Sequence, residues 1–230
     1  MHFEMGVIVE PDESLTDLLA PFDENLEVEP YIVATKQDII EGAKRRADDI
    51  SRKLKEGKDK PEELEDWEKA LLNAKTDEDF YNAAYEEYYE YDEEGNQIAR
   101  YNPDSRWDWY VIGGRWENSL LRKDGVLVDY AKIKDINFTD NDAIYYQVLD
   151  WWRRYVVNSD TDHDKELKSK HTAESLARLR CKFHTGGVLA GGEWHDMDEF
   201  SEEDWINGYY DRFIKNANPE AEFVIVDCHI

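Results

Sequence analysis

Two short apolar runs at opposite ends of the chain constrain the fold more than any other feature. Residues 2–9 are rich in β-branched side chains and are followed by Pro11, and residues 223–230 follow a turn at Asn218-Pro219. Short apolar runs bounded by turn residues indicate buried strands. A strand at a chain end is usually held by pairing inside a sheet. We therefore expect the first and last elements to be neighbours in one sheet.

Residues 38–92 have the periodicity of helices. Apolar side chains recur every three or four positions from Ile39 to Leu54, a second helix is expected from Pro61 to Lys75, and Thr76 or Asp77 can cap a third. The third would carry Tyr81, Ala84, Tyr85, Tyr88 and Tyr89 on one side, which is typical of helix packing. The pattern predicts a helical insertion over 38–92.

The second half of the chain mixes both periods. Strand-like runs occur at 110–112, 126–128 and 188–190, and helical runs at 141–157, 173–179 and 201–213. This order predicts a single α+β domain over residues 1–230, with an antiparallel or mixed sheet that contains both terminal strands. A ferredoxin-like arrangement is one form that such a sheet could take.

Charge and composition exclude several classes of function. The 54 acidic and 28 basic residues give a formal net charge of −26, which repels nucleic-acid phosphates and anionic membranes. Direct nucleic-acid binding is therefore not expected. Since 41% of residues are hydrophobic, with 8 Trp, 14 Tyr and 8 Phe, the chain should fold rather than stay disordered. No apolar run is long enough to cross a bilayer, and two cysteines make no disulfide framework, so we expect a cytoplasmic protein.

The densest group of chemically useful side chains lies between residues 101 and 116. Gly113-Gly114 allows the backbone to approach a ligand or another strand, Arg115 offers a planar fork for phosphate or carboxylate, and tryptophans offer stacking faces. These parts predict a pocket for a small nucleotide-like ligand, formed by Trp107, Asp108, Trp109, Arg115 and Trp116. In the alternative interpretation the glycines form a bulge, the tryptophans fill the core and Arg115 pairs with Asp108.

Histidines near the chain ends suggest a metal site. If the terminal strands pair antiparallel, His2 lies close to Asp227 and His229, which share one face of their strand. With His195, or with His184 of the Cys181-x-x-His184 pair, they could bind a divalent transition metal. Structural or incidental histidines are the alternative. No other cofactor is indicated, and no known hydrolase, zincin or deaminase motif names a catalytic residue.

Two acidic runs, at 86–94 and 196–204, allow a different hypothesis. On a rigid fold, rows of carboxylates could imitate DNA phosphates and block a basic, DNA-binding host protein. A solvated, solubilising surface is the simpler explanation of the same charge.

Five separated blocks of the sequence resemble a known family. They are the opening His2-Phe3 strand, residues 19–31 (LAPFDENLEVEPY), residues 107–116 (WDWYVIGGRW), residues 192–195 (GEWH) and residues 226–230 (VDCHI). Together they resemble a family of mostly uncharacterised proteins of phages and of phage-derived islands in bacteria. The helical region at 38–92 shows the least agreement, which suits an insertion.

The resemblance implies a phage or prophage accessory protein in the cytoplasm of a bacterial host, and accessory proteins of this kind often counter host defences. It supplies no catalytic residues. Our hypothesis is that the protein binds or processes a small nucleotide-like ligand, such as a defence signal, in the aromatic and arginine pocket. The alternative is an acidic mimic of DNA that binds a basic host protein.

Overall fold

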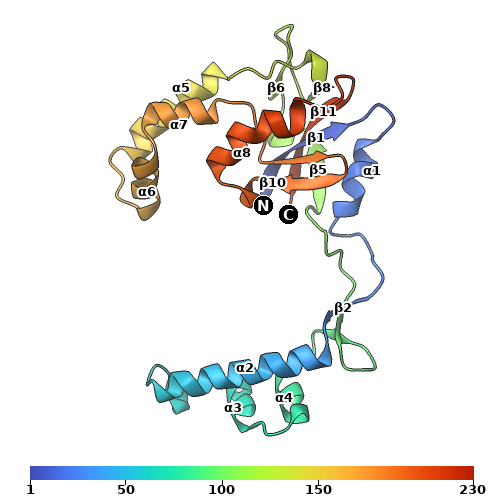
Figure 1. Cartoon of the computed structure of the whole chain (residues 1–230), viewed down its shortest axis with the longest axis vertical. Helices are drawn as coiled ribbons and strands as arrows, with labels where there is room; N and C mark the ends of the chain where they lie inside the picture. Colours follow the sequence, from blue (N-terminus) through green and yellow to red (C-terminus); the bar gives the residue numbers. More distant parts are fainter. The chain divides into compact units, whose positions relative to one another are not determined.

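The computed structural model describes all 230 residues and divides them into two compact units (Figure 1). Unit 1 contains residues 1–26 and 104–230, and unit 2 contains residues 27–103. Each unit has its own sheet and its own hydrophobic core. None of the helices is both long and apolar enough to span a bilayer.

Unit 1 is built on a six-stranded mixed sheet. The order is β10-β9-β1-β11-β5, and β8 also pairs with β11. The strands are β1 (His2–Val9), β5 (Trp109–Ile112), β8 (Tyr130–Lys132), β9 (Gly187–Ala190), β10 (Glu193–Asp196) and β11 (Glu222–His229). β1 is antiparallel to β11 over its whole length, from His2 opposite His229 to Val9 opposite Glu222, and is parallel to β9. The prediction of an α+β fold whose terminal strands share a mixed sheet is confirmed.

Helices cover both faces of this sheet. On one face, here called the α8 face, α8 (Glu202–Tyr209) packs on the strands, and its buried Trp205, Ile206 and Tyr209 join the largest core. On the other, the α1 face, α1 (Leu15–Leu19) contributes Leu19 to a second core (Figure 1). Unit 1 also contains α5 (Asp142–Trp151), α6 (Asp162–Lys170), α7 (Ala173–Arg180) and the hairpin β6 (Leu120–Leu121) and β7 (Leu127–Val128).

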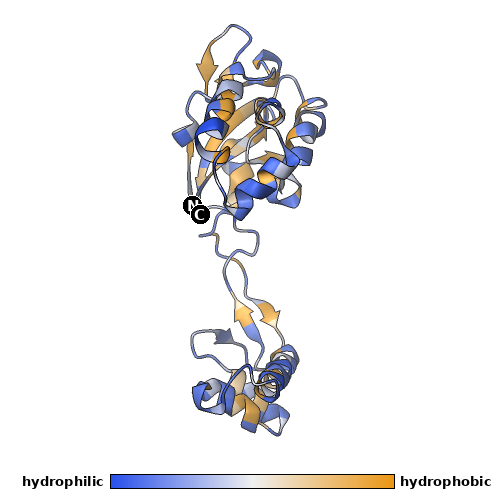
Figure 2. Ribbon diagram, turned by 90° about the vertical axis from the view of Figure 1, so that its left-hand side faces the viewer, coloured by the Kyte–Doolittle hydropathy of each residue, from blue (hydrophilic) through white to orange (hydrophobic).

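Several short helical turns extend these elements. Trp152–Val156 continues α5 and Tyr210–Ile214 continues α8, both as π-helix. Single 3-10 turns are formed by Ala20–Phe22, Gly114–Trp116, Ile133–Asp135 and Met197–Glu199 in unit 1, and by Pro61–Glu63 in unit 2. In Figure 2 the strands of the unit 1 sheet are predominantly hydrophobic and the helices are two-toned, as expected for amphipathic helices on a core.

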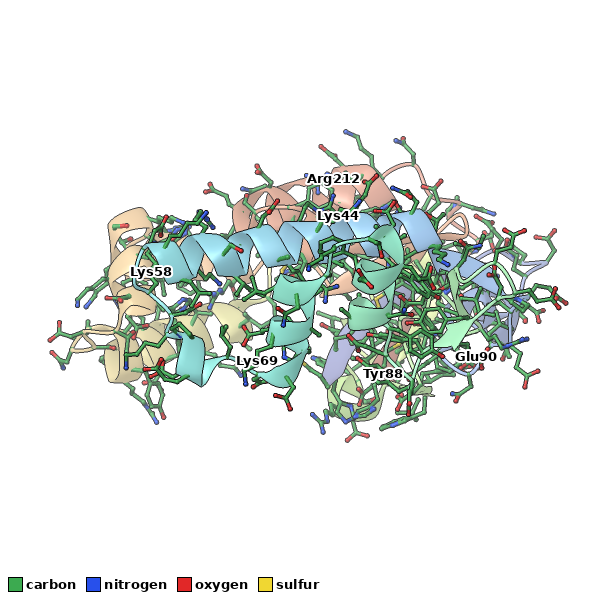
Figure 3. The ribbon with its side chains drawn as sticks, turned by 90° about the horizontal axis from the view of Figure 1, so that it is seen from below. Lys44, Lys58, Lys69, Tyr88, Glu90 and Arg212 are labelled. Carbon is green, nitrogen blue, oxygen red and sulfur yellow. The ribbon has the colours of Figure 1, made fainter.

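Unit 2 packs helices beside a small antiparallel sheet. The strands are β2 (Tyr31–Ala34), β3 (Glu90–Tyr91) and β4 (Gln97–Ala99), in the order β2-β4-β3, and the helices are α2 (Lys36–Lys55), α3 (Asp66–Asn73) and α4 (Asp77–Ala84). α3 and α4 pack along one side of α2 (Figure 3). Two helix starts follow from sequence, because Thr35 caps α2 and Thr76 caps α4, each in a capping box with an aspartate three residues later. The second helix, expected from Pro61 to Lys75, is shorter: Pro61–Glu63 is a separate 3-10 turn, Leu64 is extended, and α3 begins at Asp66.

The observed unit 2 differs from the predicted insertion at 38–92. It extends over 27–103 and includes three strands, so it is not purely helical. The third helix ends at Ala84, and Tyr85 has an extended backbone and stacks on Tyr91 of β3 with ring centroids 4.5 Å apart. Tyr88 is 74% exposed. The predicted tyrosine stripe therefore ends after Ala84, because the chain leaves the helix and Tyr85 packs on β3 instead.

Candidate functional site

Polar side chains occupy one end of the α8 face of the unit 1 sheet. His2, His229 and Trp109 stand opposite one another on β1, β11 and β5, and two residues further along Glu4 stands opposite Asp227. Residues in register on neighbouring strands point to the same face with Cβ atoms about 5 Å apart. The next positions along β1 and β11 on this face, Gly6, Ile8, Ile225 and Phe223, lie opposite one another over the core. The face thus changes from apolar under α8 to polar beyond it.

Asp227 is the most buried charged group of this polar end. The residue is 2% exposed, its Oδ1 lies 2.8 Å from His2 Nδ1, and its Oδ2 accepts a hydrogen bond of 3.0 Å from the backbone N–H of Arg115. Burial by itself raises the pKa of Asp227, but the hydrogen bonds from His2 and Arg115 outweigh it, so the pKa lies below its ordinary value. Asp227 is therefore a buried carboxylate that stays ionised.

The Gly113-Gly114 pair makes the Arg115 contact possible. Both glycines have positive φ, +71° and +57°. A Cβ on Gly114 would lie 2.5 Å from Asp227 Cβ, and a Cβ on Gly113 would lie 2.6 Å from an oxygen of Asp129. Only glycine combines this backbone with so close an approach. The sequence left open whether these glycines approach a ligand or another strand. In the structure, Gly114 approaches Asp227 of the strand β11.

His229 forms a second histidine–carboxylate pair beside the first. Its Nδ1 lies 2.9 Å from Asp108 Oδ1, and its ring stacks on Trp109 at 5.3 Å and meets the His2 ring edge-on at 4.8 Å. The hydrogen bond from His229 lowers the pKa of Asp108. The two imidazoles are held by different carboxylates and packed against one indole.

A cleft of about 880 Å³ opens next to the polar end, within unit 1. Glu4 and Ile225 from the sheet line it. Its other sides come from Trp116 with the β6–β7 hairpin, from the start of α5, and from the segment after α7. Its volume is in the range of small-molecule sites in proteins.

Glu4 gives the cleft a group that titrates near neutral pH. Burial raises the pKa of Glu4 from 4.5 to about 7, and no hydrogen bond or ion pair compensates for it. A carboxyl group with this pKa holds and releases a proton at physiological pH, which is what general acid–base chemistry requires.

His184 and Arg180 define the opposite part of the cleft. His184 Nδ1 lies 2.8 Å from the carbonyl oxygen of Lys182, so Nδ1 donates and Nε2 is left as an acceptor in the neutral ring. Burial lowers the pKa of His184, which favours that neutral form. Arg180 forms a fork to both oxygens of Glu202 at 2.6 and 3.2 Å, so its charge is already paired.

The five residues of the predicted nucleotide pocket do not share one pocket. Trp107 is 8% exposed in the core of the α1 face and donates to Leu19 O, while Trp109 stacks on His229 on the α8 face. The side chain of Arg115 is exposed and forms no ion pair, so the alternative interpretation is wrong in pairing Arg115 with Asp108, which binds His229 instead. Of the five, only Trp116 lines the cleft. Residues two apart in one strand share a face, but Trp107 lies before β5 and forms a β-bridge with Asp23 instead, so it enters the core of the α1 face.

The predicted four-residue metal site is also corrected. His2, Asp227 and His229 come together, but His195 lies on β10 opposite Val188, which is itself opposite Gly6 of β1. Four residues along β1 from His2 correspond to roughly 13 Å. His195 packs instead on Phe213, with ring centroids 5.2 Å apart. No three His, Cys, Asp or Glu side chains are arranged to hold a metal ion.

The sequence interpretation missed Glu4 as a functional residue and considered His184 only as an alternative metal ligand. A usable signal was present for Glu4, because it is the one acidic residue in the run 2–9, which is predicted to be a buried strand. Buried carboxyl groups have raised pKa values. No local sequence pattern indicated that residues at the start of α5 would line the cleft.

The two acidic runs lie in different units. Residues 86–94 lie in unit 2 around β3, whereas 196–204 lie in unit 1 and run from the last residue of β10 into the first turn of α8. Neither run is a regular row on one helix, since 86–94 is largely a turn and a short strand.

Comparison of this chain with protein-family models, with curated proteins and with solved structures found no match.

Proposed function

We propose that unit 1 binds a small nucleotide-like molecule in the Glu4 cleft, and that Glu4 exchanges a proton with it. The observation that carries the proposal is a carboxyl group with a pKa of about 7 lining a cleft of about 880 Å³. Perturbed acids in large clefts are characteristic of functional sites. The resemblance to phage and prophage proteins suggests an accessory, anti-defence role for such binding.

The charge of the lining favours the nucleoside part of such a ligand. Four acids, Glu4, Asp140, Asp142 and Glu202, face two bases, Arg180 and Lys182, and Glu202 already pairs with Arg180. A polyphosphate would meet more negative than positive charge. A neutral base and sugar with hydrogen-bond donors would meet carboxylate acceptors instead.

The uncharged lining suits a planar polar ring. Trp116 provides an aromatic surface beside the sheet. Asn137 and Asn141 use their side-chain oxygens to accept from the backbone N–H groups of Thr139 and Ala143, which leaves their amide N–H groups to donate to a ligand. Together with Glu4 and His184, these groups offer both donors and acceptors for the edge of a nucleobase.

Titration calorimetry with a panel of nucleosides and mononucleotides tests this function. We expect a nucleoside to bind with an affinity that changes between pH 6 and 8, and Glu4→Gln to remove that pH dependence. Glu193→Gln is the matched control, because Glu193 is exposed on β10 and lies outside the cleft lining. Absence of binding across the panel, or equal pH dependence in the Glu4→Gln protein, would contradict the proposal.

Mimicry of DNA stays an untested alternative. It predicts a complex with a basic host protein that weakens as salt is raised. Neutralising residues 86–94 and 196–204 separately would show which unit carries it, and a complex that survives both changes would rule mimicry out.

A further inference from the structure

Two adjoining hollows lie on α2 in unit 2, far in sequence from the Glu4 cleft. One has a volume of about 320 Å³ and the other about 480 Å³, and Gly42, Arg45 and Arg46 line both. We call the two together the α2 groove. Tyr89 and Tyr91 line the smaller hollow, and Trp67 lines the larger.

Arg45 and Arg46 are two of the three basic residues of α2 that form no ion pair; the third, Lys55, is the last residue of the helix and lies outside the groove lining. Lys36, Lys44, Arg52 and Lys53 each form an ion pair with a carboxylate, whereas Arg45 and Arg46 form none. Both are exposed and belong to a chain with 54 acidic residues. Two neighbouring guanidinium groups without an acid at ion-pair distance can bind an anion at little cost in broken contacts.

The acids in the groove are already engaged. Asp38 accepts hydrogen bonds from Thr35 at the start of α2, Asp49 pairs with Arg52 and Lys53, and Glu68 accepts from the backbone of Glu65. The fourth acid of the lining, Glu86, accepts a hydrogen bond from the Tyr88 hydroxyl. Their remaining capacity to pair with Arg45 and Arg46 is reduced. The carboxylates of the groove therefore compete less with an incoming anion for Arg45 and Arg46.

Gly42 lies in the interior of α2, where glycine costs about 1 kcal/mol relative to alanine. Neither backbone nor packing requires it, because its φ is not positive and the nearest atom to a Cβ at this position would be an Arg45 nitrogen at 4.0 Å. A glycine that the fold does not need keeps open the part of the groove that both hollows share.

Aromatic rings line both hollows. Trp67 is 46% exposed and Tyr89 is 41% exposed, so each has ring surface available to a ligand. Tyr91 is held by stacking on Tyr85. Aromatic rings beside arginines match the two parts of a nucleotide, since the ring stacks on the base and the guanidinium forks bind the phosphate.

We propose that the α2 groove is a binding site for a phosphorylated ligand with a planar ring, of the mononucleotide class. Arg45 and Arg46 bind its phosphate, and Trp67 or Tyr89 stacks on its ring. A polynucleotide carries the same chemistry, but each further phosphate is repelled by a chain of net charge −26. The site lies in a different unit from the Glu4 cleft and does not depend on the function proposed there.

The test titrates the full chain with AMP and follows the phosphate by phosphorus NMR, with adenosine and inorganic phosphate measured by calorimetry. We expect AMP to bind at least tenfold more tightly than inorganic phosphate. Arg45→Gln and Arg46→Gln should each weaken AMP binding by about tenfold or more, the size expected for one charge-assisted hydrogen-bonding group. Adenosine binding that survives both changes belongs to the Glu4 cleft, so the two sites can be distinguished.

Two further variants make the result specific to the groove. Arg52→Gln removes the same charge from the same helix, leaves Asp49 paired with Lys53, and should change AMP affinity by less than twofold. Gly42→Leu introduces a good helix former, so the helix is retained, and the leucine side chain should block binding by filling the groove. The proposal fails if AMP does not bind, if Arg52→Gln weakens binding as much as Arg45→Gln, or if Gly42→Leu binds normally. An oligonucleotide that binds more tightly than AMP would overturn the mononucleotide assignment.

Discussion

At the scale of single residues, burial decides which side chains gain chemical properties that their residue type alone does not give. Glu4 and Asp227 stand opposite each other on β1 and β11, but burial without partners raises the pKa of Glu4 to about 7, whereas two hydrogen bonds keep the pKa of Asp227 low. One carboxyl group is thereby suited to exchange a proton, and the other to anchor His2 and the Arg115 backbone.

Glu4 should make the stability of unit 1 depend on pH. Its folded-state pKa of about 7 lies above the ordinary value of 4.5, so the folded protein holds the proton more tightly than the unfolded chain. The contribution to stability is complete below about pH 4.5 and is lost as pH rises to 7, by at most about 3 kcal/mol. Urea unfolding at pH 5.5 and 8.5 measures this loss of stability, and we expect it in the wild-type protein but not in Glu4→Gln. The same change in stability with pH in both proteins would contradict the role of Glu4.

Gly114→Ala should destabilise unit 1 by roughly 2–4 kcal/mol, because the new Cβ meets Asp227 and displaces the Arg115 contact while φ stays at +57°. Gly191→Ala is the matched control, with φ of +60° and open space around its Cβ. Its cost should be only the backbone strain, about 1 kcal/mol. Chemical denaturation measures both, and equal losses would show that the close approach to Asp227 does not matter.

At the scale of elements, the positions of helix starts follow from local sequence more closely than the positions of helix ends. Thr35, Thr76, Thr161, Thr172 and Ser201 each cap the helix that follows. The end of α4 was not predicted, because Tyr85 leaves the helix to stack on Tyr91 of β3. Spacing along a helix cannot reveal a partner supplied by another strand.

Gly42→Ala should stabilise unit 2 by about 0.5–1 kcal/mol, since alanine loses less backbone entropy in a helix interior and its Cβ finds open space. Calorimetric melting should show the transition of unit 2 raised by a few degrees. Gly57→Ala, after the end of α2 with φ of +68°, should lower it instead. A lower melting temperature for Gly42→Ala would mean that Gly42 is required by the fold.

At the scale of the whole molecule, unit 2 is an insertion in the sequence of unit 1. The chain leaves unit 1 after residue 26 and returns to it at residue 104, and the segments of unit 1 at these two points lie side by side. The backbone of Glu24 donates to Trp107 O at 2.8 Å, and Asp23 bridges Trp107, so the two ends of unit 1 around the insertion are already held together. The two cores of unit 1 and the core of unit 2 each contain buried residues from one unit alone.

Replacing residues 27–103 by a short Gly-Ser linker should therefore leave unit 1 folded. We expect a cooperative thermal transition and the same dependence of stability on pH through Glu4 as in the full chain. Circular dichroism and urea unfolding measure both. A linker protein that is unfolded, or that melts without cooperativity, would show that unit 1 needs unit 2.

The sequence by itself determined the strands at the chain ends, their pairing, the α+β class and most helix starts, because these depend on short-range periodicity, capping and β-branched composition. Only the tertiary structure decided the Glu4 cleft and the α2 groove. Glu4, Trp116, Asn141 and His184 come from four distant segments, and Arg45 and Tyr89 from two. Their proximity, and the burial that raises the pKa of Glu4, arise from long-range packing that no local pattern encodes.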